Sequence, residues 1–570
     1  MSFKDQQPQK QPILLVECWQ RALSYLQFVH TPTLCSLLRV NKMFYGLAAP
    51  LLYSSPFVLV KGNAVKWNEE ERTERLVMLL RLFLAELDPT LQAELPPWTT
   101  EEDDDDLQEG WINDDTTTST DKKDDRRHLM STMVRKYFFH YRWHDHSFLV
   151  AKVIPTVFGV TEKRDCHNIL HTLDRLFLCH NSGSVLSMCV SVKRSTAQLE
   201  SLLPTLSCLR RIEVHNIEDI SESALDKLVD WIHAHDQRFG TLRELQIGGL
   251  TEYDEYDLSR DTFMLKLARA IKHLTVLDTK SWTEAWSMVD QLPVEQLERL
   301  ALEYGGNKAT IQGGDFLLRC KRLKILDLFV PTPSIFRTVA ECVSPTMGSS
   351  PRVFSSPFLS SGPSVPALER LYLSGSLANL KQSVEDAATA FAGTLKILKV
   401  TSVSRSRTTL APSIRWEGVH MPYLTELQLQ HDIARELPFS VLARVAPNLT
   451  ILKLLVNGIE SCGQDNNPVE GILALTKLQV LQLLGAWPLT RSFIRGLRTS
   501  VQGLKILDIE RCLGIELDET MQELSRMEYL WRVGWDLEDI SEEVERVVEL
   551  WKVKAPQIEV GSIGWDEYYV

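Results

Sequence analysis

The densest group of metal-binding or nucleophilic side chains lies between Asp165 and His180, where the sequence reads DCHNILHTLDRLFLCH. His167 and His171 are four residues apart, so on a helix they would share one face, as paired zinc ligands do. The cysteines and histidines match no zinc-ligand spacing, however, and the rest of the stretch is apolar with a helical period. We interpret it as a helix with core thiols and surface histidines, and we expect no metal site and no cofactor.

Sequence motifs for phosphate binding or hydrolysis are absent. The chain contains no GxxxxGK[ST], no GxSxG and no HExxH. Gly305-Gly306 and Gly313-Gly314 flank a segment between leucine-rich stretches, without the strand-to-helix context of a phosphate cradle. Scattered serines, histidines and aspartates nominate no catalytic triad, which is recognised by geometry rather than by sequence position. The sequence therefore favours a chain that is not an enzyme.

Composition and charge narrow the class of protein further. The 570 residues are 44% hydrophobic and 24% charged, which is typical of a folded chain. Of the net charge of −13, the acidic run Glu101–Asp125 contributes −10 from 12 acidic and 2 basic residues. Nucleic-acid binding needs clustered lysines and arginines, so we expect no nucleic-acid partner. We interpret residues 95–128 as an acidic disordered loop.

Neither export nor membrane insertion is indicated. No stretch reaches the roughly 18 apolar residues that span a bilayer, and the polar start is unlike a secretory signal. The ten cysteines form no CxxC pair, which favours reduced thiols. We therefore expect a cytoplasmic and/or nuclear protein with no membrane partner.

A leucine pattern repeats from the middle of the chain to its end, and it predicts the strands that would position any site. The pattern LxxLxL occurs twelve times, with some degenerate copies, and most starts are 23 to 29 residues apart. The first leucine-type residues are Leu209, Leu242, Leu274, Leu297, Leu323, Leu368, Leu395, Leu424, Leu449, Leu478, Leu504 and Met527. Positions 4 and 6 of each copy alternate along a short strand and bury one face. Helical segments are expected between strands at 221–235, 261–271, 380–391 and 438–445, so stacked units would share one core.

This region, residues 205–535, resembles the leucine-rich-repeat family, which implies an α/β solenoid shaped as a horseshoe. The family's position-9 Asn or Cys is present only as Asn457 and Cys512, which favours an irregular horseshoe. An earlier match around Leu173 either begins the repeats or ends a helix, with 185–192 as the strand. Residues 331–366, rich in Ser-Pro pairs, are predicted to be a mobile insertion loop.

Residues 8–57 predict a small helical domain. Leu15, Leu23 and Leu26 show a helical period, a second helix would start near Pro32, and a third would end before the proline of Ala48-Ala49-Pro50. Three short helices cannot build a robust core alone, so we expect their apolar faces to be exposed in the isolated chain and covered by a partner.

These helices resemble an F-box, and an F-box followed by leucine-rich repeats resembles fungal F-box proteins. The matching features are Pro12, Ser24-Tyr25-Leu26, and the segment from Val40 to Ala48, with Asn41 and Phe44 in place of the usual Cys and Trp. The resemblance implies a Skp-type adaptor and, through it, a cullin as partners. The implied adaptor contacts are Pro12, Leu15, Leu23, Leu26, Leu34, Leu37, Leu38, Val40 and Phe44.

The resemblance implies the substrate-recognition subunit of a Skp–cullin–F-box ubiquitin ligase. The alternative is a leucine-rich scaffold or inhibitor outside ubiquitination, whose N-terminal helices cap the solenoid. Positions 3, 5 and 7 of each copy face away from the core, and from the fifth copy onward they become more apolar. We predict that an unknown target protein binds there, at Ile325, Phe329, Tyr372, Ile397, Lys399, Ile451, Lys453, Leu455, Val480, Leu484 and Ile506.

The remaining parts of the chain complete the predicted organisation. Residues 58–94 would be a connecting strand or helix segment, and residues 129–204 an N-terminal cap with the first irregular repeats. Residues 536–570 would form a C-terminal cap with an acidic and aromatic tail. That tail either caps the last strand by aromatic packing or occupies the concave face or a partner.

Overall fold

The computed structural model describes a subset of the chain. The described residues are 23, 44, 47–48, 51, 73, 76–77, 80–81, 84, 140–141, 149–160, 162–180, 185–191, 203–215, 222–248, 265–279, 294–303, 315–329, 335–343, 365–402, 416, 419–435, 437–456, 469–512, 514–535 and 542–561. The chain divides into two compact units. The first comprises residues 1–214, 226–242 and 570, and the second comprises residues 215–225 and 243–569.

The first unit is mixed α/β where it is described. Its strands are β1 (His140–Tyr141), β2 (Ser187–Ser191) and β3 (Arg211–His215), and β1 pairs with β2 in parallel. Its helices are the π-helical turn Leu149–Val153, α10 (Ile154–Phe158), α11 (Lys163–His180), the 3-10 turn Leu203–Thr205 and α13 (Glu222–Phe239). The ambiguous match around Leu173 lies inside α11, so it belongs to a helix, and the predicted strand at 185–192 is β2.

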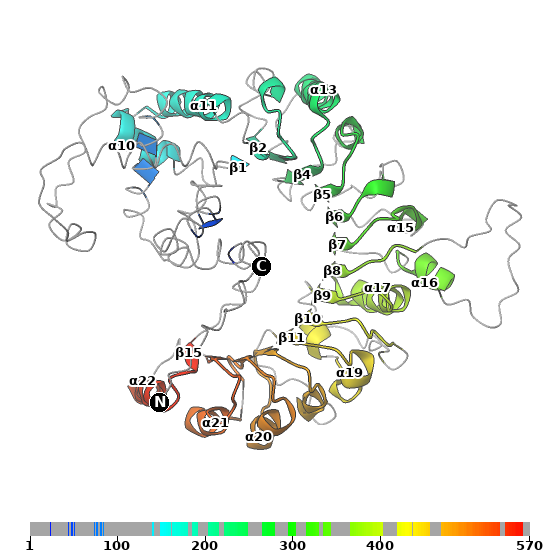
Figure 1. The fold of residues 1–570 in the computed structure, drawn as a ribbon, viewed down its shortest axis with the longest axis vertical. Coiled ribbons are helices and arrows are strands. Elements are labelled where there is room, and N and C mark those ends of the chain that lie inside the picture. The colour runs from blue at the N-terminus through cyan, green and yellow to red at the C-terminus, as the bar shows by residue number, and fades with distance from the viewer. Residues whose placement is uncertain are drawn as a thin grey trace, which may run out of the picture. The chain divides into compact units, whose positions relative to one another are not determined.

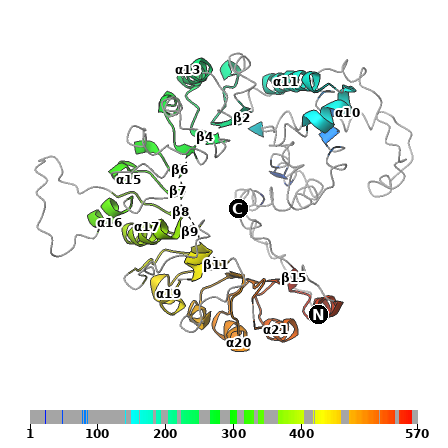
Figure 2. The same ribbon diagram turned by 180° about the vertical axis from the view of Figure 1, so that it is seen from behind.

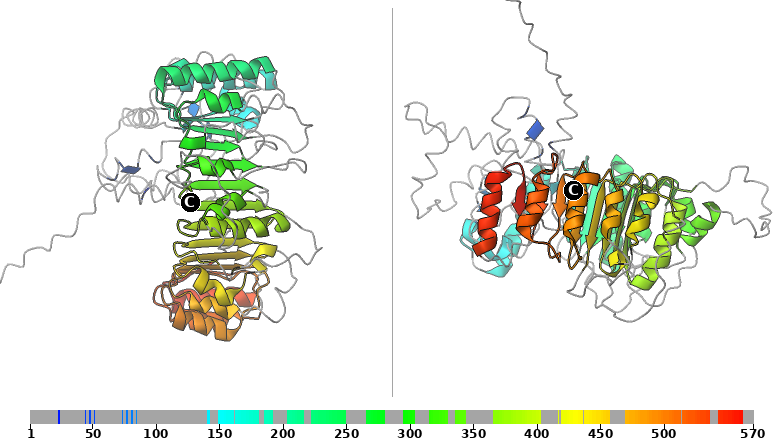
Figure 3. Two further views of the ribbon diagram at one scale, coloured as in Figure 1. Left: turned by 90° about the vertical axis from the view of Figure 1, so that its right-hand side faces the viewer. Right: turned by 90° about the horizontal axis from the view of Figure 1, so that it is seen from below.

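The second unit is a stack of parallel strands. In sheet order they are β4 (Glu244–Gly248), β5 (Val276–Thr279), β6 (Arg299–Glu303), β7 (Ile325–Phe329), β8 (Arg370–Gly375), β9 (Ile397–Ser402), β10 (Glu426–Gln430), β11 (Ile451–Leu455), β12 (Val480–Leu484), β13 (Ile506–Asp508), β14 (Arg532–Gly534) and β15 (Glu559–Gly561). Every strand pairs in parallel with the next one along the chain. Figure 3 shows these strands as a stack. The expected α/β repeat solenoid is confirmed for this unit.

Helices cover one side of these strands. They are α15 (Asp315–Arg319), α16 (Arg337–Val343), α17 (Leu377–Ala390), α18 (Asp432–Arg435), α19 (Phe439–Val445), α20 (Arg491–Ser500), α21 (Leu517–Leu524) and α22 (Glu542–Lys554), with 3-10 turns at Val294–Gln296 and Val469–Ala474. Within this unit they lie outside the arc of strands, which leaves the other sheet face on the inner, concave side (Figures 1 and 2).

The leucine pattern sets which strand residues face the helices. Leu326, Leu398, Leu452 and Leu481 occupy position 4 of their copies and are at most 1% exposed. Leu398 and Leu452 both lie beside Leu427 of β10, so consecutive copies are in register without a shift. A continuous apolar core therefore runs between the strands and the helices, as the period predicts.

Hydrogen bonds between consecutive copies fix this register at the strand starts. The Thr425 hydroxyl donates to Lys396 O at 3.1 Å, and the Thr450 hydroxyl donates to Thr425 O at 3.0 Å. At position 9, the Cys512 thiol donates to Leu483 O of the preceding copy at 3.1 Å. Asn457, the other position-9 match, lies outside the described residues.

The prediction that residues 331–366 form a loop throughout is wrong. Residues 337–343 form α16, and Ile335, Phe336 and Val339 beside or within it are fully buried. Phe336 packs edge to face on Phe391, with ring centroids 6.1 Å apart. Three apolar side chains at helical spacing were enough to bury this segment, despite the Ser-Pro pairs that follow it. Residues 344–364 lie outside the described part of the chain.

Candidate protein-binding face

The concave face of β7 to β13 carries three rows of side chains. Because strand residues alternate, positions 3, 5 and 7 of each copy point away from the helix-covered core. We call position 5 the middle row, and it holds, from β7 to β13, Asp327, Tyr372, Lys399, Gln428, Lys453, Gln482 and Asp508. The first row (position 3) and the last row (position 7) flank it. Since the strands are in register, each middle-row residue lies beside its neighbour on the next strand.

A cation is held at the centre of the middle row. Lys399 Nζ lies 5.5 Å from the Tyr372 ring centroid and 3.1 Å from Glu426 Oε1 of the first row. The Lys399 and Glu426 side chains are only 16% and 15% exposed, so this ion pair is screened less than a surface pair. The aromatic ring and the carboxylate together fix the ammonium on the sheet.

The middle-row side chains are more deeply buried toward β13, and this burial shifts the pKa values of Lys453 and Asp508. Burial lowers the pKa of Lys453 to about 8, although the Glu426 and Asp508 carboxylates favour its charged form. Burial, together with the nearby Glu510 carboxylate, raises the pKa of Asp508 to about 7. Gln482 Nε2 opposes this rise by donating to Asp508 Oδ2 at 3.1 Å. Near neutral pH, both groups can therefore change charge when their surroundings change.

Apolar rows flank the buried polar groups. Ile451, Val480 and Ile506 lie side by side in the first row, and Leu455 and Leu484 lie side by side in the last row. Ile506 and Leu484 are 8% and 7% exposed, and the other three are half-buried. The arrangement can bind an extended segment whose polar groups follow the middle row and whose apolar side chains lie on the flanking rows.

The structure brings all eleven predicted target-binding residues onto this one face. Lys453, Leu484 and Ile506 are buried, and the other eight are half-buried. Lys453 is 5% exposed although its side chain faces away from the core. Whether a target protein binds here stays a prediction.

Sequence reasoning missed two polar members of the face. Gln428 and Gln482 are 3% and 0% exposed, as deeply buried as core leucines. Among the described residues, no donor reaches Gln482 Oε1. The available signal was the unbroken polar sequence at position 5 of copies that are otherwise apolar, namely Lys399, Gln428, Lys453, Gln482 and Asp508.

Only two of the predicted adaptor contacts are among the described residues. Leu23 and Phe44 are both helical, and Leu23 is 2% exposed while Phe44 is half-buried. The expectation of an exposed apolar face is therefore wrong at Leu23, which the chain buries by itself. Pro12, Leu15, Leu26, Leu34, Leu37, Leu38 and Val40 lie outside the described residues.

The Cys and His stretch is the helix α11. Cys166 is 1% exposed, and its thiol donates to Val160 O at 3.5 Å, which gives it a packing role. His167 is half-buried, and the side chains of His171, Cys179 and His180 are not described. In the described part of the chain, no three His, Cys, Asp or Glu residues form a group that could hold a metal ion.

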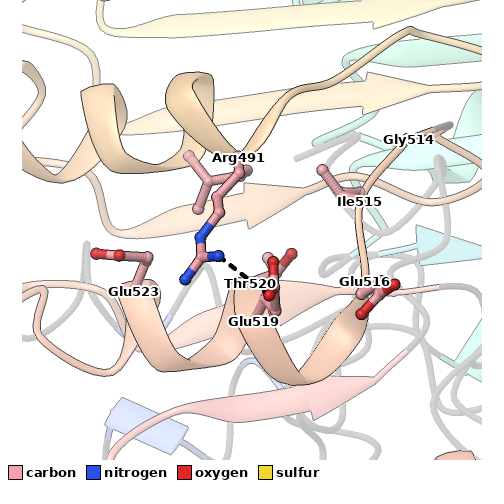
Figure 4. A pocket seen from close by; sticks show the side chains of 8 residues that line it. Arg491, Gly514, Ile515, Glu516, Glu519, Thr520 and Glu523 are labelled. Carbon is pink, nitrogen blue, oxygen red and sulfur yellow. Dashed lines mark hydrogen bonds and ion pairs between the residues drawn. The ribbon is translucent and has the colours of Figure 1, made fainter.

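A small pocket lies on the helix side of the second unit, between α20 and α21 (Figure 4). Arg491 reaches across it to Glu519, with Nη1 3.1 Å from Oε1. Glu523 on α21, whose side chain is 8% exposed, forms ion pairs with two arginines of α20, Arg498 at 3.0 Å and Arg495 at 3.5 Å. These pairs join one repeat to the next, so the carboxylates here hold consecutive helices together.

No family model and no curated protein matches the chain. Of the solved structures, the chain is similar to one described as the crystal structure of the Rad7 and Elc1 complex in yeast, at 11% sequence identity and a TM-score of 0.33. The match covers 78% of this chain and 98% of the other chain. At that TM-score the likeness carries no argument about function. Among the described helices, none is long and apolar enough to cross a bilayer.

Proposed function

We propose that this protein is the substrate-recognition subunit of a Skp–cullin–F-box ubiquitin ligase. Its N-terminal helices dock on a Skp-type adaptor, and its concave face holds a target protein. The observation that supports target binding is that all the predicted target-binding residues lie on one face of the sheet. The first half rests on the F-box-like sequence at residues 8–57.

In this proposal the protein forms no covalent bond itself. It brings lysines of the target near a ubiquitin-charged enzyme, which raises their effective concentration there. It uses no cofactor, and it works in the cytoplasm and/or nucleus. The part of the face best suited to a target is β7 to β9, where Phe329, Tyr372 and Ile397 are half-buried beside Lys399.

Co-purification with the adaptor and the cullin separates this proposal from a scaffold outside ubiquitination. The double variant Leu38→Asp and Phe44→Asp introduces two charges, and burying each without a partner costs several kcal/mol. We expect adaptor recovery to fall at least tenfold, with an unchanged circular dichroism spectrum of the repeats. Full recovery with the double variant would favour the scaffold.

Proximity labelling tests the target-binding half. The variant Phe329→Ser with Ile397→Ser removes two half-buried apolar side chains from β7 and β9. The matched control is Glu244→Ser with Gln246→Ser, at half-buried positions of β4 on the same face. We expect the first pair to lose its main labelled proteins while the control retains them, with adaptor recovery equal in both. Loss with the β4 pair alone would move the target site to the early repeats.

A further inference from the structure

The first row of the concave face combines cations with apolar side chains on β5 to β9. In strand order this row holds Val276, Arg299, Ile325, Arg370 and Ile397, which are two arginines and three aliphatic residues with no acid among them. Ile325 and Ile397 are half-buried, and Arg370 is exposed. We call these five residues the arginine row.

The first arginine of the row presents its guanidinium, while the carboxylate that pairs with it is recessed. Arg299 Nη2 lies 3.5 Å from Oδ2 of Asp278 on β5, and the two side chains are 42% and 12% exposed. A guanidinium carries five N–H donors, so Arg299 can bind a second carboxylate without releasing Asp278. Arg299 therefore still offers donors to a partner.

The second arginine has no ion pair within the described part of the chain. Arg370 is exposed, and no described side chain hydrogen-bonds it or pairs with it. Asp327, in the middle row of the preceding strand, makes its contact elsewhere. Glu369, which precedes Arg370 in the chain, is bound by Lys396 at 2.9 Å. The Arg370 guanidinium is therefore available to a carboxylate from another molecule, which it can bind through two parallel hydrogen bonds.

The strand register fixes the spacing of the two arginines. Ile325 on β7 lies beside Arg299 of β6 on one side and beside Arg370 of β8 on the other. Adjacent strands are ~4.8 Å apart, so the two arginines are about 9.6 Å apart along the row. An extended chain advances ~3.3 Å per residue, so this distance corresponds to about three residues of a segment that runs across the strands.

We propose that the target segment bound on β6 to β9 is an extended, acidic peptide with two carboxylates about three residues apart. One carboxylate pairs with Arg299 and the other with Arg370, and an apolar side chain between them packs on Ile325. This inference rests on the proposed target-binding function and names the chemistry of its ligand.

The separation of the arginines favours two carboxylates over one phosphate group. A phosphorylated side chain is bound by arginines that converge on its oxygens. Arg299 and Arg370 are instead separated by the apolar Ile325, so each can serve one singly charged group. The target class is therefore defined by its acidic residues and does not require phosphorylation.

Selection from a random peptide library tests this preference without knowledge of the target. A phage-displayed library of twelve-residue peptides is selected on the parent chain and on its Arg370→Met and Arg370→Glu variants. We expect the parent to enrich pairs of Asp or Glu at the stated spacing at least tenfold over the unselected library. Arg370→Met should lose the preference at one of the two positions, and Arg370→Glu should replace it with Lys or Arg there. The matched control is Arg322→Met, at an exposed arginine in the turn before β7, and it should keep the parent's preference.

A double-mutant cycle measures the contact itself. A selected peptide is synthesised with a fluorophore, and its affinity for the parent is compared with that for Arg370→Met. We expect Arg370→Met to weaken binding at least tenfold. Glutamine in place of the paired acid of the peptide should weaken binding by the same factor, and the two changes together should weaken it no further. Arg299→Met combined with Asp278→Asn, which leaves no unpaired aspartate, should give the same result for the other acid. Circular dichroism spectra of all variants should match the parent.

Two negative results are distinguishable. Peptides that lose binding with Phe329→Ser and Ile397→Ser but show no acidic preference would overturn this inference and leave target binding on the face intact. If no selected peptide is sensitive to that pair or to Arg370→Met, both this inference and target binding on the face are overturned. Neither measurement involves the adaptor, so the outcome is independent of the F-box-like helices.

Discussion

Asp508 is the residue whose ionisation the fold opposes most clearly. Its side chain is fully buried on β13, and burial raises its pKa from 3.8 to about 7, while the hydrogen bond from Gln482 acts in the opposite direction. Between these two values the folded chain holds a proton that the unfolded chain has lost. The free energy of unfolding must therefore fall as the pH rises through this window.

We predict that the parent chain loses stability relative to Asp508→Asn between about pH 4 and pH 7, by up to a few kcal/mol. Urea unfolding followed by circular dichroism at several pH values measures the difference. The histidines titrate in both proteins and cancel. Asp327→Asn, at the half-buried middle-row position of β7, is the matched control and should run parallel to the parent. A pH-independent difference between the parent and Asp508→Asn would show that Asp508 stays charged when folded.

A second prediction about a single residue concerns Gly485. It follows β12 with φ of +102°, its amide donates to Glu510 O at 3.0 Å, and a Cβ there would overlap the carbonyl of Val456. Such a backbone conformation alone costs a non-glycine residue ~1–3 kcal/mol. Gly485→Ala should therefore lower the urea midpoint strongly. Gly503→Ala, where a Cβ meets no atom closer than 4.0 Å, should change it little. Equal urea midpoints for the two variants would show that Gly485 does not lie against the Val456 carbonyl as described.

The strand is the element that the sequence predicts best. Each LxxLxL copy from Leu242 to Leu504 forms a strand whose fourth and sixth positions face the core, because the period-2 alternation is a local property of the chain. We predict that Leu326→Ala costs ~2–5 kcal/mol of unfolding free energy, as for buried leucines generally. Lys324→Ala, two residues earlier and paired only at the surface with Glu298, should cost less than about 1 kcal/mol. Denaturant unfolding compares the two, and equal losses would contradict the register.

Elements whose burial depends on distant chain were harder to predict. α16 lies in a segment that its Ser and Pro content marks as a loop, and Phe336 beside it packs on the distant Phe391. The deep burial of Lys453 and Gln482 was equally hard to predict, because alternation along a strand fixes the face on which a side chain lies but not its exposed fraction. The eleven predicted face residues were placed correctly on one surface by alternation alone, whereas their exposure was not predictable from it.

At the scale of the molecule, stability is distributed along a row of neighbours. Each strand from β5 to β14 pairs with the strand before it and the strand after it, so the stability of the unit is close to a sum of repeat and nearest-neighbour terms. Such a structure opens locally rather than all at once when one repeat is weakened. In a globular domain with one core, by contrast, a buried substitution lowers the stability of the whole domain.

Leu398→Ala, in the middle of the unit on β9, tests this property by hydrogen exchange. The leucine is 1% exposed, so its truncation should cost ~2–5 kcal/mol in the local opening free energy. Each 1.4 kcal/mol is about tenfold in an equilibrium constant, so amides of β8 to β10 should exchange at least about tenfold faster. Amides of β4 and β5, four or more strands away, should keep their rates, because no shared neighbour links them to β9. The exposed Lys396→Ala, two residues earlier, is the control and should leave all rates nearly unchanged. A uniform acceleration from β4 to β15 would instead show that the repeats unfold as one cooperative block.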